Sequence, residues 1–147
     1  MLVKLLPDQI ARYWELIRWG LTEGGREDLL AKKDKLNNIL EALLVDRMQC
    51  WWYVIDDGEK DSKVISSVIT STQYDYTEKR ENLCIFSVFG FEDIDKSWWH
   101  DGMQTIENYA RGRGYSKLVG YTDNVFLIRL ARARGWDCRL TYVEKEL

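Results

Sequence analysis

His100 and Cys84 are the first residues to consider as candidates for acid–base or nucleophilic chemistry. His100 is the only histidine and is followed by Asp101, and the imidazole is the side chain that titrates closest to neutral pH. His100 is therefore a candidate general base; the alternative is an ordinary surface residue at the start of a helix. Cys84 carries a thiol that could act as a nucleophile, but its apolar neighbours favour an inert, buried thiol.

Two pairs of adjacent tryptophans are the other unusual feature: Trp51 with Trp52, and Trp98 with Trp99. Neighbouring residues in a strand or a helix point in different directions, so a single buried face cannot cover both members of a pair. Exposed tryptophan is typical of protein contact surfaces. We therefore expect these four residues to form an interface; the alternative is that they cover the open side of a small core.

The composition is that of one ordinary folded domain. The chain has 147 residues, of which 46% are hydrophobic and 31% are charged, with a single proline. Its three cysteines and one histidine form no paired ligand motif, so we expect neither a disulfide framework nor a metal site. No uncharged run is long enough for a membrane span. We expect a single domain over residues 1–147.

Charge is distributed unevenly along the chain. Residues 1–102 carry 13 basic and 19 acidic side chains, whereas residues 103–147 carry 8 basic and 5 acidic ones. The C-terminal third is thus the part that could attract an anion such as phosphate; the alternative is solvated arginines on helix faces. With an overall formal charge of -3, the chain is not expected to bind nucleic acid.

The hydrophobic spacing predicts the elements that would position these residues. Apolar side chains at helical intervals predict helices at residues 7–23, 29–46, 97–112 and 126–135. Aromatic and β-branched runs bounded by turn residues predict strands at residues 49–55, 63–74, 82–91, 117–122 and 138–143. The expected order is ααβββαβαβ.

This order resembles the GNAT acyltransferase fold, and two segments carry the resemblance locally. Residues 109–118 look like the end of that family's third helix and the strand after it. Residues 124–136 match, without gaps, the family's pattern of an asparagine, an apolar stretch with Ile-Arg-Leu, and a terminal glycine before an aromatic residue. The resemblance implies an α/β (α+β) domain with a mixed sheet and helices on both of its faces.

In this family a glycine-rich turn opens the third helix and takes up the pyrophosphate of acetyl-coenzyme A with bare backbone N–H groups. Aligned on the last glycine of that turn, this chain has Ser-Trp-Trp-His-Asp-Gly at residues 97–102, without the family's basic residue and first glycine. The resemblance leaves these positions to face a coenzyme: Phe89, Gly90, Phe91, Gly102 and Asn124. Because indoles and carboxylates crowd the segment, we expect no cofactor.

The proton donor and acceptor of the family's reaction are also poorly represented. Ala131 stands where a tyrosine commonly protonates the departing thiolate. Candidates for a base are Glu92 at the end of the third expected strand, His100, and both Tyr121 and Asp123 after the next strand. The resemblance alone does not choose between these candidates, so the catalytic residues are unknown from the sequence.

The chain also resembles small phage-encoded proteins of this fold, through the runs at residues 37–40, 48–51, 89–91 and 120–123. Together with the degraded turn and the surplus tryptophans, this leads us to expect a non-catalytic phage protein that binds a phage structural protein or a host protein. It would lie in the host cytoplasm or be built into the virion. The alternative is an acetyl-coenzyme A dependent N-acyltransferase that modifies a host or phage amine.

Overall fold

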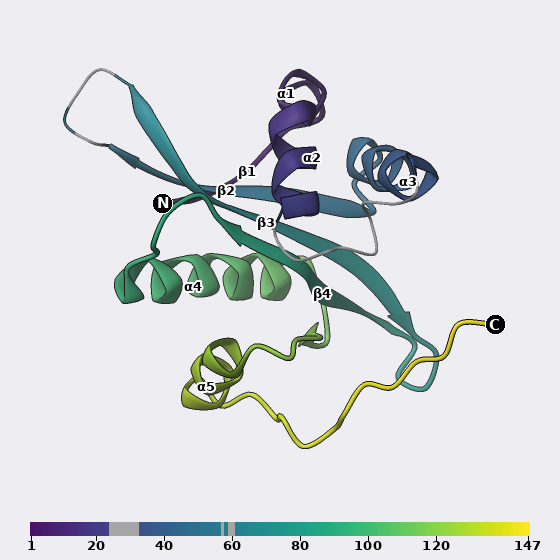
Figure 1. Ribbon diagram of the computed structural model, residues 1–147. Coiled ribbons are helices and arrows are strands. Elements are labelled where there is room, and N and C mark those ends of the chain that lie inside the picture. The colour runs from purple at the N-terminus through teal and green to yellow at the C-terminus, as the bar shows by residue number, and fades with distance from the viewer. Residues whose placement is uncertain (24–32, 57, 59–60) are drawn as a thin grey trace.

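The computed structural model describes residues 1–23, 33–56, 58 and 61–147 (Figure 1). Its elements in chain order are β1 (Leu2–Lys4), α1 (Pro7–Arg12), α2 (Trp14–Glu23), α3 (Lys33–Leu44), β2 (Met48–Asp56), β3 (Ser62–Asp75), β4 (Arg80–Gly90), α4 (Lys96–Gly112), β5 (Leu118–Gly120) and α5 (Val125–Ala133). The helix expected to begin at residue 29 is described only from Lys33 onward, and part of the segment between the strands expected at residues 49–55 and 63–74 lies outside the described residues.

The five strands form one sheet in the order β1-β2-β3-β4-β5. The first four strands are antiparallel, and β5 pairs with β4 in parallel. Helices α1, α2 and α3 cover one face of the sheet and α4 covers the other, with α5 beyond α4 (Figure 1). This arrangement confirms the expected mixed sheet with helices on both faces.

Each face of the sheet carries its own apolar core. The core under α1–α3 consists of Leu5, Ile10, Ile17, Leu21, Leu36, Ile39, Leu43, Cys50, Trp52 and Ile69. The core under α4 consists of Leu2, Trp51, Tyr53, Ile65, Val68, Leu83, Ile106 and Ala110. Since side chains alternate along a strand, successive residues of β2 enter opposite cores. Strands β2 and β3 therefore contribute apolar residues to both cores.

The N-terminal part differs from the expectation in two ways. Residues Leu2–Lys4 form an edge strand that pairs with β2, and so short a segment has no detectable periodicity. The expected helix over residues 7–23 is interrupted at Tyr13, which ends α1 with a φ of -105° before α2 begins. Tyr13 packs against Trp52 with ring centroids 5.2 Å apart, so the interruption seats a ring over the sheet.

The expected strand at residues 138–143 is wrong. No element follows α5, and Leu140 and Val143 are 94% and 84% exposed. A segment with alternating apolar residues forms a strand only when its backbone can pair with the edge of a sheet. The edge strand here, β5, has only three residues, Leu118–Gly120. The expected strand at residues 117–122 is shortened to those three because the chain then leaves the sheet to reach Asn124, the N-cap of α5.

Candidate functional site

The parallel strands β4 and β5 separate part-way along β4. Their pairing runs from Leu83 with Leu118 to Ile85 with Gly120 and ends there, whereas β4 continues to Gly90. The register of β4 against β3 also shifts at this point, so that Phe86 is the extra residue of a β-bulge. Within the described residues, the second half of β4 therefore pairs with β3 on one side and with no strand on the other.

The backbone of this half-strand presents polar groups to the open side. The N–H of Leu83 donates to the carbonyl of Lys117 on the β5 side, and the N–H of Phe91 donates to Ile65 on the β3 side, both at 2.9 Å. Backbone groups alternate in direction along a strand, so the N–H and C=O of Val88 and Gly90 point away from β3. A linear, amide-containing ligand can pair with such an edge as an added strand does.

On the α4 face the opening is filled by side chains. An apolar cavity of about 40 Å³ remains there, lined among others by Tyr53, Val88, Trp98 and Trp99. The ring of Trp98 lies 6.1 Å from that of Tyr53, between centroids, and Trp99 contacts Phe126 of α5 edge to face at 6.3 Å. A space of this size holds about one water molecule, and no part of a large ligand.

The first turn of α4 is closed by its own cap. Asp95 Oδ1 accepts hydrogen bonds from the backbone N–H of Ser97 at 2.8 Å and from its hydroxyl at 2.6 Å. The N–H groups of Trp98 and Trp99 donate to the carbonyl of Asp95 at 3.0 and 3.3 Å. The hydrogen bonds from Ser97 lower the pKa of Asp95 below its usual value, so an ionised carboxylate stands at this helix terminus.

Two residues expected to face a coenzyme have other roles. Gly102 is buried, and a Cβ there would lie 3.8 Å from Tyr53 and 3.9 Å from Leu2, so this glycine faces the sheet. The Asn124 side chain accepts from the N–H groups of Phe126 and Leu127 at 2.9 and 3.3 Å, which makes it the cap of α5. Neither residue belongs to a phosphate-binding turn in this structure.

An aromatic group lies at the end of β4 on the α1–α3 face. Trp19 stacks on Phe91 with centroids 5.9 Å apart and meets Phe89 edge to face at 5.3 Å. Gly20 permits this packing, since a Cβ there would come within 3.3 Å of the Phe89 ring. Trp19 remains 48% exposed. Phe89 and Phe91, two of the expected coenzyme positions, thus form an apolar platform beside the open edge.

The expected bases are placed on separate segments. Glu92 pairs with Lys63 at 2.5 Å, and the exposed ring of Tyr121 packs on Tyr142 at 4.7 Å. Asp123 is exposed in the loop before α5. No hydrogen bond or ion pair joins these side chains to one another or to His100 within the described part of the chain. The structure therefore does not bring the four candidates together.

His100 belongs to a cluster that the sequence did not indicate. Arg134 Nη1 lies 3.1 Å from His100 Nδ1, and Arg134 Nη2 donates to Glu107 Oε1 at 2.9 Å. The Nε atom of Arg134 is buried and has no partner among the described residues. The three residues join α4 to the end of α5, 27 and 34 positions apart in sequence, and this separation explains why local patterns did not reveal the cluster.

The interface expectation for Trp51 and Trp52 is corrected by their burial. They are 3% and 6% exposed and enter opposite cores. Trp51 Nε1 donates to Thr70 Oγ1 at 3.0 Å, and Thr70 donates to Gln49 Oε1 at 2.7 Å. The prediction overlooked that a sheet covered on both faces can bury two adjacent indoles.

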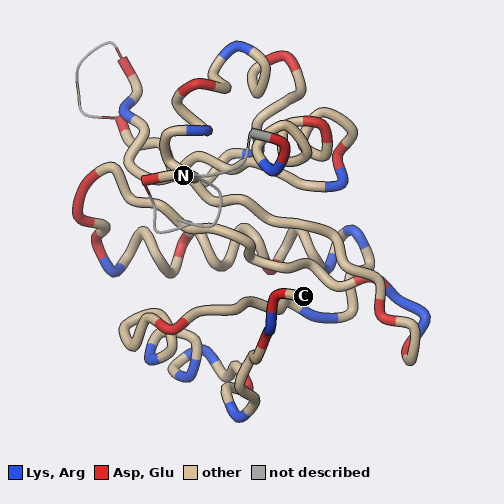
Figure 2. Tube along the Cα trace, turned by 45° about the vertical axis from the view of Figure 1, so that its right-hand side comes forward, with Lys and Arg blue, Asp and Glu red and all other residues tan. Residues whose placement is uncertain are grey.

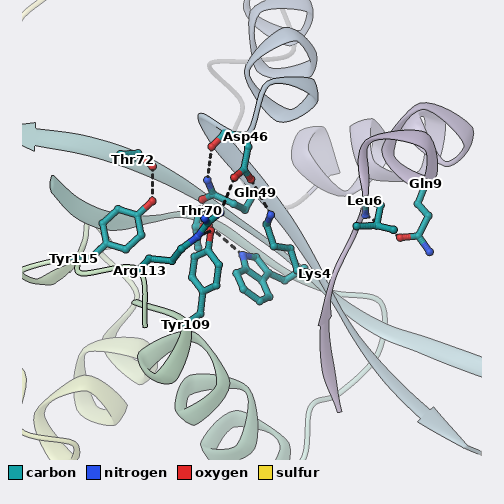
Figure 3. A network of polar contacts seen from close by, with 11 residues as sticks. Lys4, Leu6, Gln9, Asp46, Gln49, Thr70, Thr72, Tyr109, Arg113 and Tyr115 are labelled. Atoms are coloured by element: carbon teal, nitrogen blue, oxygen red, sulfur yellow. Dashed lines mark hydrogen bonds and ion pairs between the residues drawn. The ribbon is translucent and has the colours of Figure 1, made fainter. Parts of the chain in front are cut away.

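Beside these residues, Asp46 pairs with Lys4 at 2.8 Å and with Arg113 at 2.9 Å (Figure 3). Arg113 Nε also donates to the hydroxyl of Tyr109 at 3.3 Å. These contacts tie the α3–β2 turn to β1 and to the C-terminus of α4. Every member of the network has a partner in the protein, so we assign the network to the fold.

The described residues contain no cluster of three or more His, Cys, Asp or Glu side chains that could hold a metal ion. None of the described helices is both long and apolar enough to span a membrane.

The described architecture matches solved acetyltransferases over its whole length. A structure named a probable acetyltransferase superposes with a TM-score of 0.74 at 10% identity, covering 100% of this chain and 96% of that one. A ribosomal-protein-alanine N-acetyltransferase from Brucella melitensis biovar Abortus 2308 gives a TM-score of 0.68 at 12% identity, covering 100% and 99%. An aminoglycoside N-acetyltransferase in complex with CoA gives 0.66 at 15% identity, covering 100% and 95%.

The chain has a GNAT fold. At these identities the likeness shows the fold alone, and no family model and no curated protein sequence matches the chain. The expectation of a non-catalytic phage or virion component is wrong, because the structural neighbours are named acetyltransferases, among them N-acetyltransferases. These comparisons give no support to a place in a phage particle.

Acetyl-coenzyme A, the donor implied by the GNAT fold, fits this site only in part. Its extended amide-containing arm is compatible with the open edge of β4, where Val88 and Gly90 present backbone groups. Its diphosphate is not compatible with the first turn of α4, where the N–H groups of Ser97, Trp98 and Trp99 donate to Asp95 and the capping side chain is an anion. The residues present thus fit the thioester arm and do not fit the nucleotide end.

Proposed function

We propose that this protein is an N-acyltransferase, which moves an acyl group from a thioester to an amine. The observation that carries the proposal is the separation of β4 from β5 after Ile85, which leaves a polar backbone edge inside a GNAT fold. The named neighbours act in the same general way: one on a ribosomal protein and others on aminoglycosides, as their names state.

The open edge supplies hydrogen-bond donors for the reacting carbonyl. Charge develops on the thioester oxygen when an amine adds to the carbonyl carbon, and backbone N–H groups fixed by a strand stabilise it without rearranging. The N–H groups of Val88 and Gly90 are the ones that point to this side. A side chain at position 90 would be crowded, since a Cβ there would lie 3.0 Å from the carbonyl oxygen of Glu92 and 3.1 Å from the side chain of Ile94. Glycine avoids this crowding.

The transfer balances without a cofactor other than the thioester itself. The amine nitrogen forms a bond to the carbonyl carbon, the C–S bond breaks, and its electron pair leaves with sulfur. The nitrogen loses one proton to water, and the thiolate takes up one proton from water. A thiol with a pKa near 8.5, as in cysteine, is a good leaving group, so replacing the family's tyrosine by Ala131 is compatible with transfer.

The amine approaches from the α1–α3 face. Trp98, Trp99 and α4 cover the opposite face of the opening. On the α1–α3 face the end of β4 carries the platform formed by Trp19, Phe89 and Phe91. An exposed indole stacked on a ring offers both an apolar surface and attraction for a cationic amine. This platform is the part of the proposed site that meets the acceptor.

The test is transfer of an acetyl group from a thioester to a panel of amines. Acetyl-coenzyme A and S-acetylpantetheine serve as donors, and peptides with free N-termini and aminoglycosides serve as acceptors. We expect mass spectrometry to show an acceptor that gains one acetyl group only when the protein is present, and at least tenfold less product with Trp19→Ala. Failure of every donor with every acceptor, at millimolar donor, would contradict the proposal.

A further inference from the structure

We propose that this protein recognises its acyl donor through the thioester arm and not through a nucleotide diphosphate. This inference rests on the proposed function and deepens it by naming the donor class, which comprises acyl thioesters of pantetheine-like amines. Three independent observations around the start of α4 carry it: its hydrogen bonds, its charges and its side-chain packing.

The hydrogen bonds come first, because a diphosphate in a protein site is usually held by N–H groups at a helix N-terminus. In α4 the three N–H groups of Ser97, Trp98 and Trp99 already donate to Asp95, through its carboxylate or its carbonyl. A diphosphate could gain the N–H of Ser97 only by displacing the Asp95 carboxylate, whose capping hydrogen bond stabilises the helix.

The charges oppose a diphosphate as well. Glu92, Asp93 and Asp95 are exposed within four residues of one another in the loop from β4 to α4. Two cations lie near these carboxylates: Lys63, which is paired with Glu92, and Lys96, the exposed first residue of α4. Figure 2 shows the resulting run of acidic positions before α4, whereas basic positions gather on α5. The carboxylates of Glu92, Asp93 and Asp95 outnumber these two lysines, so the net charge that a diphosphate would meet here is negative.

The packing removes the remaining space. A phosphate that approaches a helix backbone closely needs residues without side chains, and residues 97–101 include no glycine. Trp98 lines the cavity against the sheet, and Trp99 packs on Phe126. Gly102, the first glycine of the helix, faces Tyr53 and Leu2. The turn thus has no bare backbone surface at which a diphosphate would fit.

The edge of β4 is free of these obstacles. Val88 and Gly90 present their backbone groups about one strand-width from β3, where an extended amide chain can pair. Donor affinity then comes from the arm, so removing the nucleotide should not weaken it. Because the N-terminus of α4 does not bind the diphosphate, we expect acetyl-coenzyme A to bind no more tightly than a shorter thioester.

The experiment compares kcat/KM for acetyl-coenzyme A and S-acetylpantetheine with one acceptor. We expect the two values to agree within tenfold, and a preference of more than tenfold for acetyl-coenzyme A overturns the inference while leaving the proposed function in place. Transfer from neither donor overturns the proposed function, and this inference with it. Calorimetry with inorganic pyrophosphate gives a readout without turnover: we expect no binding at millimolar concentration, and saturable binding overturns the inference.

Asp95→Asn provides the matched test of the charge, since asparagine also caps helices. It should raise kcat/KM for acetyl-coenzyme A about two- to fivefold and leave that for S-acetylpantetheine unchanged. Asp75→Asn is the control, because Asp75 makes the same kind of contacts to Thr77 at the far end of β4. Equal effects of Asp95→Asn on both donors, or an equal gain from Asp75→Asn, overturn the inference.

Discussion

Trp99 and Phe126 meet edge to face with ring centroids 6.3 Å apart, and this contact joins the first turn of α4 to the first turn of α5. Helix α5 has no fully buried residue. Its position against α4 therefore depends on a few half-buried contacts, among them this ring pair and the contacts of Arg134 with Glu107 and His100.

Trp99→Ala should loosen α5 without unfolding the sheet. Amide hydrogen exchange in residues 128–134 should accelerate at least tenfold, because an aromatic pair contributes about 1 kcal/mol beyond the apolar area that is also lost. Exchange at Ile65 and Ile69, in the two cores, should stay the same. Uniform acceleration across the sheet, or none in α5, would show that the contact does not hold this helix.

The Arg134–Glu107 pair should contribute more to stability than a surface pair. The two side chains are 19% and 17% exposed, so Arg134→Ala leaves a half-buried carboxylate and should lower the free energy of unfolding by about 1–3 kcal/mol. Arg139, paired with Asp137 but 85% exposed, is the matched control, and Arg139→Ala should leave the free energy of unfolding unchanged within error. Urea unfolding measures both, and equal effects would refute the distinction.

Alkaline pH should weaken the fold through Cys50. Burial raises the pKa of this thiol from 9.0 to about 12, so the folded chain keeps a proton that the unfolded chain releases. The free energy of unfolding should thus fall as pH rises from 9 towards 12, by roughly 1.4 kcal/mol per pH unit for this group. Burial and the hydrogen bond to Asp101 likewise raise the pKa of Tyr53 to about 12.

The variant Cys50→Ala shows how much of this pH dependence of the unfolding free energy comes from the thiol. The difference in unfolding free energy between the original chain and the variant should be constant below pH 8.5 and should shrink above pH 9. Urea unfolding at pH 7, 8, 9 and 10 measures it. A difference that stays constant through pH 10 would mean that the thiol ionises equally in both states.

Val88→Pro should abolish transfer while leaving the sheet intact. Proline removes the N–H, which points away from β3 and makes no ladder hydrogen bond there. We expect at least a tenfold loss of acetyl transfer with an unchanged unfolding midpoint to within a few degrees. Val68→Ala, at the cross-strand partner in the same cavity, controls for lost packing and should retain transfer. Full activity of Val88→Pro would remove the backbone edge from the proposed site.

The sequence predicted the element types where a pattern was long and local. The helical spacing after Phe126 and the family-like run at residues 124–136 were enough to indicate the fold. The alternating pattern at residues 138–143 wrongly predicted a strand, since that segment pairs with no strand of the sheet. The burial of both Trp51 and Trp52 depends on helices from both ends of the chain, which residue patterns within β2 do not report.

The candidate site was less predictable than the fold. The indoles at the start of α4 and the missing glycines were visible in the sequence, and the structure places Trp98 and Trp99 at the opening. The cap by Asp95 was not predicted, although an aspartate just before a helix is a common N-cap signal. The separation of β4 from β5 and the platform around Trp19 arise from segments far apart in the chain. Only the folded arrangement reveals them.

Backbone amide NMR of the 15N-labelled protein, titrated with S-acetylpantetheine, tests most directly whether the edge of β4 binds a thioester. The account predicts that the amide signals of Val88 and Gly90 shift most and saturate with a common affinity, while the amides of Ser97 and Trp98 in the capped turn stay in place. Unchanged Val88 and Gly90 signals at millimolar donor would contradict it.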